Sequence, residues 1–314
     1  MTTVVPDRVS ADGIARVEAL IRPYVRETPV LMLDRADFGL APGPLAVKLE
    51  FLQHTGSFKA RGAFAQLLLR DVPPAGIVAA SGGNHGAAAA YAARARGVPA
   101  RIFVPTVSSP AKIERIRRYG ADLVVDGASY DDALAGSRRW QETSGALDVH
   151  AFDRIETMLG TGTIAAEIRR QVPGRSTVLA AVGGGGLLAG LVAGHDGPVV
   201  GVEPALAPTL TEALRAGRPV DAPVGSVAID SLAPLRIGDR TYPVIAAGVH
   251  DVLLVDDDEI RAAQRALWDT LRVAVEPGGA TAFAALLAGR YVPASGEIPV
   301  FVLSGANTTA VSFD

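Results

Sequence analysis

Residues 178–193 read VLAAVGGGGLLAGLVA, an apolar run followed by four glycines and a second apolar run. The first run predicts a buried strand, and the second predicts a helix that begins directly after the glycine turn. Glycines let backbone amides approach a ligand closely, and the N-terminus of the helix adds a partial positive charge. The segment therefore predicts a phosphate-binding strand, turn and helix. The alternative is a tight turn that binds nothing.

Short apolar runs alternate with segments of helical period along nearly the whole chain, a pattern typical of an α/β protein with largely parallel sheets. Helices are expected to begin at Ser57, at Asn84 and near Ser109, where Pro110 suits the first helical position. Four prolines and little periodicity in 217–245 predict a long irregular segment. The predicted strands are 45–50, 77–80, 100–104, 122–126, 147–151, 177–182, 198–203, 251–255 and 298–303.

Composition narrows the function classes. The chain has 314 residues, of which 49% are hydrophobic, and a net charge of −3. A large core is expected, and neither nucleic acid nor a membrane is an expected partner. The absence of cysteine excludes disulfides and thiolate chemistry, and the five scattered histidines predict no metal site. No export signal or membrane span is visible, so we expect a cytoplasmic protein that acts on a small molecule.

The glycine block also matches part of a dinucleotide-binding fingerprint. Gly184, Gly186 and Ala189 have G-x-G-x-x-A spacing. Glu203 follows about 20 residues later in the sequence, where such a fingerprint has the acidic residue that contacts the ribose. That fingerprint normally lies in the first strand-to-helix turn of its domain, whereas five predicted strands precede this one. A phosphate site is therefore the stronger prediction, and an NAD-dependent oxidoreductase is the alternative.

Three further turns carry candidate residues. In LEFLQHTGSFKARGA (49–63), Lys59 lies in the first turn of a predicted helix, where the helix dipole helps to lower the pKa of an amine. That suits a Schiff-base lysine, although a surface lysine is the common alternative. The strand IPVFVL ends at Ser304, at the edge of the sheet where ligands of open α/β folds bind. A turn-forming serine is the alternative there.

The turn SGGNHG (81–86) precedes a long alanine-rich helix. Its side chains and amides could bind an anion such as a carboxylate. Asn84 could instead be a plain helix cap, and His85 a histidine packed in the core. The candidate residues are Ser81, Gly82, Gly83, Asn84 and His85.

Together these segments resemble the fold-type II pyridoxal phosphate enzymes, and within them the threonine dehydratase and serine racemase family. The resemblance covers nearly the full chain in the expected order, whereas the NAD alternative explains one segment only. It implies two domains with twisted, mostly parallel sheets flanked by helices: a cofactor-binding domain (1–47 and 155–314) and an inserted substrate-side domain (48–154). The motifs are KLEFLQHTGSFKARGA (48–63), SGGNHG (81–86), VGGGG (182–186), VEP (202–204), VEPGGA (275–280) and LSGAN (303–307).

The resemblance also implies residue roles. Lys59 would bind pyridoxal phosphate covalently and act as the base, and Phe58 would pack near the ring. Asn84 would contact the ring hydroxyl, and Ser304 would face the ring nitrogen. SGGNHG would bind the substrate carboxylate. The cofactor-binding set is Phe58, Lys59, Asn84, Gly183, Gly184, Gly185, Gly186, Leu187, Glu276 and Ser304.

The implied activity is that of an ammonia-lyase: β-elimination of water from a 3-hydroxy amino acid such as L-threonine or L-serine, giving a 2-oxo acid and ammonia. A homodimer is implied as well. The alternatives are a dehydratase of a bulkier 3-hydroxy amino acid, a racemase, another activity of the same fold, or a non-catalytic protein that binds pyridoxal phosphate.

Three positions depart from the family pattern. Gly82 stands where related racemases carry a serine that acts as an acid, which disfavours racemisation. Near Glu203, Thr209 replaces the aspartate expected in a divalent-cation site, and a hydroxyl is a weaker ligand for a hard cation. Phe51 replaces a usual asparagine near the entrance, which points to an unusual substrate.

Overall fold

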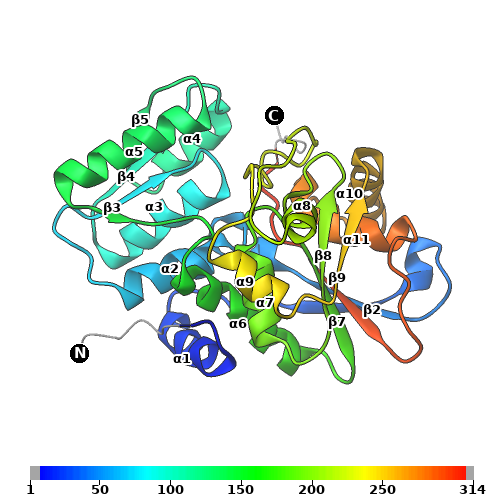
Figure 1. Ribbon diagram of the computed structural model, residues 1–314. Coiled ribbons are helices and arrows are strands. Elements are labelled where there is room, and N and C mark those ends of the chain that lie inside the picture. Colours follow the sequence, from blue (N-terminus) through cyan, green and yellow to red (C-terminus); the bar gives the residue numbers. More distant parts are fainter. Residues whose placement is uncertain (1–7, 309–314) are drawn as a thin grey trace.

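The computed structural model describes residues 8–308 and contains two β-sheets, seen at the right and upper left of Figure 1. The larger sheet has the strand order β1-β2-β10-β7-β8-β9 and is parallel except for the β1–β2 pair. Its strands are β1 (Val30–Asp34), β2 (Pro44–Lys48), β7 (Ser176–Ala181), β8 (Val199–Pro204), β9 (Asp251–Val255) and β10 (Ile298–Val302).

The smaller sheet is parallel throughout and has the order β5-β4-β3-β6. Its strands are β3 (Ile77–Ala80), β4 (Ala100–Val104), β5 (Asp122–Val125) and β6 (Leu147–Asp148). The predicted α/β fold class is confirmed. These four strands lie within the predicted inserted domain, 48–154, but the domain boundaries themselves stay a prediction.

Helices cover the sheets and fill the space between them. They are α1 (Ala11–Ile21), α2 (Lys59–Leu69), α3 (Asn84–Arg96), α4 (Pro110–Arg117), α5 (Tyr130–Ser144), α6 (Ile155–Gln171), α7 (Gly186–Gly194), α8 (Thr209–Ala216), α9 (Thr241–Ala246), α10 (Asp257–Leu271) and α11 (Pro277–Leu287). Three short 3₁₀ turns are η1 (Arg35–Phe38), η2 (Glu50–Leu52) and η3 (His54–Gly56).

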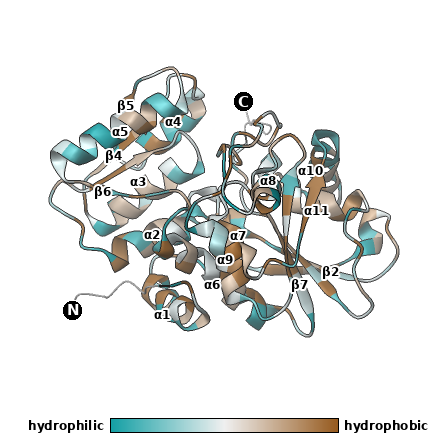
Figure 2. Cartoon of the chain, in the orientation of Figure 1, coloured by the Kyte–Doolittle hydropathy of each residue, from teal (hydrophilic) through white to brown (hydrophobic). Residues whose placement is uncertain are grey.

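Side chains of β7 alternate between two cores because successive residues of a strand point to opposite faces. Leu179 packs in the cluster that includes Phe283 of α11, and Val178 packs in the cluster that includes Ile164 of α6. The larger sheet is therefore buried on both faces. Figure 2 shows the complementary pattern, with hydrophilic residues along outer helices such as α5 and α10. Within residues 8–308, no helix is both long and apolar enough to cross a membrane.

Most predicted elements are present, and the exceptions have physical causes. The edge strand β1 was not predicted, although its sequence VLMLD begins with four apolar residues; among the described strands it pairs with β2 alone, and none of its residues is fully buried. The helix expected from Ser57 begins at Lys59, since Ser57 is extended and bridges Gly305. The predicted strand 147–151 ends at Asp148. The segment 217–245 is irregular, as predicted, until α9 begins at Thr241.

Candidate active site

The candidate site lies at the carboxyl ends of three neighbouring parallel strands. Strand β10 lies between β2 and β7, and each strand is followed by one predicted motif. The amide of Phe58 donates a hydrogen bond to the carbonyl oxygen of Ser304 (3.1 Å), and Ser57 forms an antiparallel bridge with Gly305. Backbone pairing therefore brings the lysine segment and the serine segment side by side.

Lys59 is the first residue of α2, and its side chain is only partly exposed. Its Nζ donates a hydrogen bond to the carbonyl oxygen of Ala151 (3.0 Å) and lies 4.9 Å from the centre of the Phe58 ring. Burial lowers the pKa of Lys59 to about 8, against the opposing effect of the Glu276 charge. A larger fraction of the amine is therefore neutral near pH 7 than for a surface lysine, and the neutral amine is the reactive form.

The glycine turn connects β7 to α7 and leaves backbone amides without acceptors. Residues 184–187 are buried, and within 8–308 no group accepts a hydrogen bond from their amides. Buried amides are rarely unpaired, and a cluster of them at a helix N-terminus suits a phosphate. Gly185 has φ +88, a backbone conformation that favours glycine. The turn thus fits the phosphate group of the predicted cofactor.

Asn84 belongs to a group of three polar side chains that connects the two halves of the site. Its Nδ2 donates to Oε1 of Glu276 (2.6 Å), and Nδ2 of Asn307 donates to its Oδ1 (2.5 Å). The Asn307 amide donates to Oε2 of Glu276 (3.2 Å). Burial raises the pKa of Glu276, and the hydrogen bonds from Asn84 and Asn307 oppose this. The contact of Asn84 with the ring hydroxyl stays a prediction. Within residues 8–308, the second hydrogen of the Asn84 Nδ2 group remains available for it.

His85 is packed in the interior. Its Nε2 lies 2.7 Å from the carbonyl oxygen of Val149, and burial, followed by the charge of Lys59, lowers the pKa of His85 to about 3. The ring is therefore neutral, and Nε2 donates its hydrogen to Val149. This matches the alternative of a core histidine, so any contact of His85 with a substrate carboxylate would involve its backbone amide.

The rest of the SGGNHG turn surrounds the start of α3. The amide of Gly83 donates to Oγ of Ser81 (3.2 Å), so this amide is already paired. The amides of Asn84 and His85 have no acceptor within residues 8–308 and begin the helix. Carboxylate binding by the five predicted residues, 81–85, stays a prediction.

Ser304 is buried directly after β10. Its Oγ lies 3.4 Å from the carbonyl oxygen of Gly278, which is long for a hydroxyl hydrogen bond. The hydroxyl is therefore available to another acceptor, such as a ring nitrogen. Phe51 packs against the core of the larger sheet, with its amide bonded to the carbonyl oxygen of Leu303.

Sequence reasoning missed three groups at this site. The carbonyl of Ala151 contacts Lys59, and Phe152 lies so close to the glycine turn that a Cβ on Gly184 would be 2.4 Å from its ring. No local pattern marks either residue. Asn307, which pairs with Asn84, ends the LSGAN motif and could have been included on that signal.

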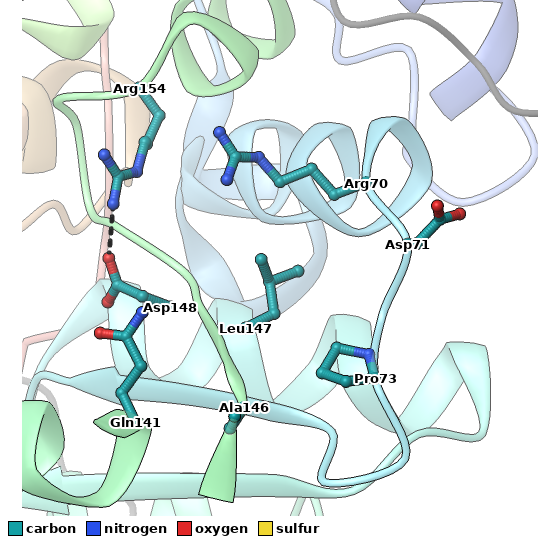
Figure 3. Close-up of a pocket in the computed structure, with 9 residues that line it drawn as sticks. Arg70, Asp71, Pro73, Gln141, Ala146, Leu147, Asp148 and Arg154 are labelled. Atoms are coloured by element: carbon teal, nitrogen blue, oxygen red, sulfur yellow. Dashed lines mark hydrogen bonds and ion pairs between the residues drawn. The ribbon is translucent and has the colours of Figure 1, made fainter. Parts of the chain in front are cut away.

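A separate open pocket of about 320 Å³ lies beyond the end of α2 (Figure 3). Arg154 donates to Asp148 there (2.9 Å), and Arg70 pairs with Glu156. None of the predicted site residues lines it. The lining residues are Arg70, Asp71, Pro73, Gln141, Gly145, Ala146, Leu147, Asp148 and Arg154.

The fold and the site place a partly buried lysine, and a glycine turn with backbone amides unpaired within the described residues, at one edge of an α/β sheet. Residues 21–305 match the family model described as "Pyridoxal-phosphate dependent enzyme", and the chain belongs to that family. Its cofactor is pyridoxal phosphate. The predicted family and cofactor are confirmed, and the NAD alternative is wrong.

Similar proteins indicate which members of the family this chain resembles. The chain is 37% identical to a phenylserine dehydratase from Ralstonia pickettii, over 99% of this chain and 96% of that protein. It is 39% identical to an L-threonine ammonia-lyase from Geobacter sulfurreducens, over 84% of this chain and 67% of the relative. The structure of maize serine racemase matches with a TM-score of 0.90 and 33% identity, covering 96% of this chain and 94% of that one. The predicted relationship to dehydratases and racemases is confirmed.

Proposed function

We propose that this protein removes water from a 3-hydroxy amino acid and so produces a 2-oxo acid and ammonia. The observation that carries this proposal is the position of Lys59, whose amine has a pKa of about 8 and lies at the sheet edge that bears the glycine turn. The names of the relatives from Ralstonia and Geobacter support the reaction class. L-threonine, L-serine and the bulkier phenylserine are the substrates to test.

The residues of the site divide the chemistry between them. Pyridoxal phosphate, when bound, supplies an aldehyde for the substrate amine and a ring that withdraws electrons from the α-carbon. The amides of residues 184–187, unpaired within residues 8–308, would hold its phosphate, and Phe58 would pack near its ring. Lys59 Nζ removes the α-proton as a general base. The neutral hydroxyl of Ser304 does not keep the ring nitrogen protonated, which favours early loss of the β-hydroxyl as water. The released enamine hydrolyses to the 2-oxo acid and ammonia.

The test is an absorption spectrum of the purified protein, followed by assays of 2-oxo acid and ammonia with L-threonine, L-serine, phenylserine and the D-amino acids. We expect a visible cofactor band and turnover of at least one L-substrate. Lys59→Ala should lose both the band and the activity, whereas Arg117→Ala, at an exposed surface pair, should retain both. A protein that shows the band but turns over none of these substrates would contradict the dehydratase proposal and favour a non-catalytic role.

One contact favours racemisation as a second candidate function. Racemisation needs a proton donor on the face of the α-carbon opposite Lys59, and Gly82 supplies none. A Cβ on Gly82 would lie 2.3 Å from Oγ of Ser108, so the Ser108 hydroxyl occupies the space of a side chain at position 82. Chiral analysis of L-serine should then show D-serine, and Ser108→Ala should abolish D-serine while 2-oxo acid formation continues. Absence of D-serine from the wild-type reaction would reject this candidate.

A homodimeric state and a cytoplasmic location are the remaining parts of the proposal. The edge strand β1 exposes Leu31 and Met32 by 39% and 42%, which supports an interface on that side. Light scattering on the purified protein and cell fractionation test the two statements. A monomer, or a membrane-bound fraction, would contradict them.

A further inference from the structure

Glu203, at the end of β8, accepts hydrogen bonds on both carboxylate oxygens. Its Oε1 accepts from the Leu210 amide (2.7 Å) and lies 3.1 Å from Oγ1 of Thr209. Its Oε2 accepts from the amide (2.9 Å) and the hydroxyl (2.7 Å) of Thr211. Glu203 and Thr209 are both completely buried. Glu203 therefore acts as an acceptor that caps the first turn of α8.

This donor set does not fit the divalent cation that the family resemblance implies next to Glu203. Such a cation takes about six oxygen ligands, with carboxylates prominent among them. Here hydrogen-bond donors surround the Glu203 carboxylate, and the carbonyl oxygen of Ala207 already accepts from the Thr209 amide (3.1 Å). Within residues 8–308, no three His, Cys, Asp or Glu side chains are grouped so that they could bind a metal ion.

Thr209 also contacts the glycine turn. Its Oγ1 lies 2.8 Å from the carbonyl oxygen of Gly183, the first glycine of the turn, and 3.1 Å from Glu203. Thr209 has one hydroxyl hydrogen for these two acceptors, and its Oγ1 lies closer to the Gly183 oxygen. Thr209 thus connects the turn that binds the phosphate to the buried carboxylate at the end of the next strand.

We propose that Thr209 positions the glycine turn by this hydroxyl bridge, so that the protein binds pyridoxal phosphate without a divalent cation. The proposal rests on the cofactor of the family but not on the identity of the substrate. Thr209 is a positioning residue, because it contacts the carbonyl of Gly183 and not the cofactor itself. Its readouts are therefore the dissociation constant of pyridoxal phosphate and the unfolding temperature, both of which can be measured without turnover.

The first experiment compares wild-type protein before and after dialysis against EDTA, with metal analysis and with added Mg²⁺ or Ca²⁺. We expect no stoichiometric metal, and no change in cofactor affinity or unfolding temperature under any of these conditions. Loss of cofactor affinity after EDTA, restored by either cation, would overturn the proposal.

The second experiment removes the hydroxyl in Thr209→Val. This change leaves the half-buried Gly183 carbonyl without its donor, and we expect the dissociation constant of pyridoxal phosphate to rise about tenfold. Thr209→Ser keeps a hydroxyl and should rescue affinity. Thr211→Val is the matched control, because it removes one hydrogen bond from Glu203 without touching the glycine turn. Equal loss of affinity in Thr209→Val and Thr211→Val would contradict a specific role for Thr209.

Discussion

The reactivity of Lys59 depends on a balance between burial and one nearby carboxylate. Burial lowers the pKa of Lys59 to about 8, and the negative charge of Glu276 raises it again. Glu276 is itself buried and bonded to Asn84 and Asn307, so its distance from the amine is constrained by a network and not by a flexible surface chain. At the residue scale, burial and the Glu276 charge together set the pH range in which the lysine is neutral.

Substitution of Glu276 by Gln tests this balance. Uptake of pyridoxal phosphate by the apo-protein requires neutral Lys59, so its rate should rise with pH and level off above about 8 in the wild type. Glu276→Gln removes the charge that raises the pKa of Lys59, so the midpoint should move to lower pH. Stopped-flow absorbance across a pH series measures the uptake rate and its midpoint in the wild type and in the variant. A midpoint that moves upward would contradict the assigned sign.

A second prediction at this scale concerns the glycine turn. In Gly184→Ala the new Cβ would lie 2.4 Å from Cγ of Phe152, too close for any real contact. We expect weaker cofactor binding and a lower unfolding temperature, because either the ring or the turn must move. The double variant Gly184→Ala with Phe152→Ala should recover part of the cofactor affinity. If Phe152→Ala worsens the defect instead, the proposed clash is not its cause.

At the scale of elements, a buried charge cluster connects β2, α2 and α6. Arg61 of α2 contacts Glu50 and Glu167 at 2.8 Å each, and Lys48 of β2 contacts Glu167 at 2.6 Å. All four side chains are fully buried. Burial alone would raise the pKa of Glu167, but Arg61 and Lys48 outweigh it and lower the pKa to about 2. The cluster joins the helix that carries Lys59 to the larger sheet and to α6.

Glu167→Gln should destabilise the protein by about 3–5 kcal/mol at pH 7, because among the described residues it leaves buried Lys48 without a carboxylate partner and leaves Arg61 with Glu50 alone. A lowered carboxyl pKa stabilises the fold above the unfolded value of 4.5, and this stabilisation disappears as the pH falls toward about 2. The wild-type and variant stabilities in urea should therefore converge in acid. The exposed pair of Glu114 with Arg117 provides the control, and Glu114→Gln should cost less than about 1 kcal/mol. A similar loss of unfolding free energy in Glu167→Gln and Glu114→Gln would contradict a stabilising role of the buried cluster.

At the scale of the whole molecule, an ion pair beside the site joins α4, on the side of the smaller sheet, to the irregular segment 217–245. Lys112 of α4 contacts Asp230 at 2.8 Å, and Asp230 belongs to the irregular segment on the side of the larger sheet. A Cβ on Gly83 would lie 3.5 Å from the Asp230 carbonyl oxygen, so this segment covers the SGGNHG turn. We expect the pair to hold α4 and this segment together when substrate is bound.

Asp230→Asn tests this bridge. The Asp230 side chain is 72% exposed, so the variant should change the free energy of unfolding by less than about 1 kcal/mol. The KM should rise by up to about fivefold at low salt, and the difference should vanish at high salt, where the wild-type pair is screened. Asp239→Asn, which breaks a pair with Arg236 in the same segment, is the control. An equal KM increase in the control would contradict the bridging role.

Local patterns were sufficient to predict the fold class, the bounds of strands such as 77–80 and 251–255, and the turns that carry Lys59, Asn84 and Ser304. These features arise from hydrophobic period, glycine turns and helix starts, all of which are encoded within a few neighbouring residues. The resemblance of several motifs in order was enough to predict the cofactor. The edge strand β1 escaped prediction although VLMLD begins with four apolar residues, because so short an apolar run does not by itself distinguish a strand from other structure.

Other features of the site depend on contacts between distant parts of the chain. The hydrogen bonds from Asn84 to Glu276 and from Asn307 to Asn84 span 192 and 223 residues, and no local pattern encodes such pairs. The order of strands places Ser304 between Lys59 and the glycine turn, and packing brings Phe152 onto that turn. The bridge from Thr209 to Gly183 depends in the same way on β7 pairing with β8. Only the folded chain brings these groups together, because their positions follow from how strands pair and helices pack.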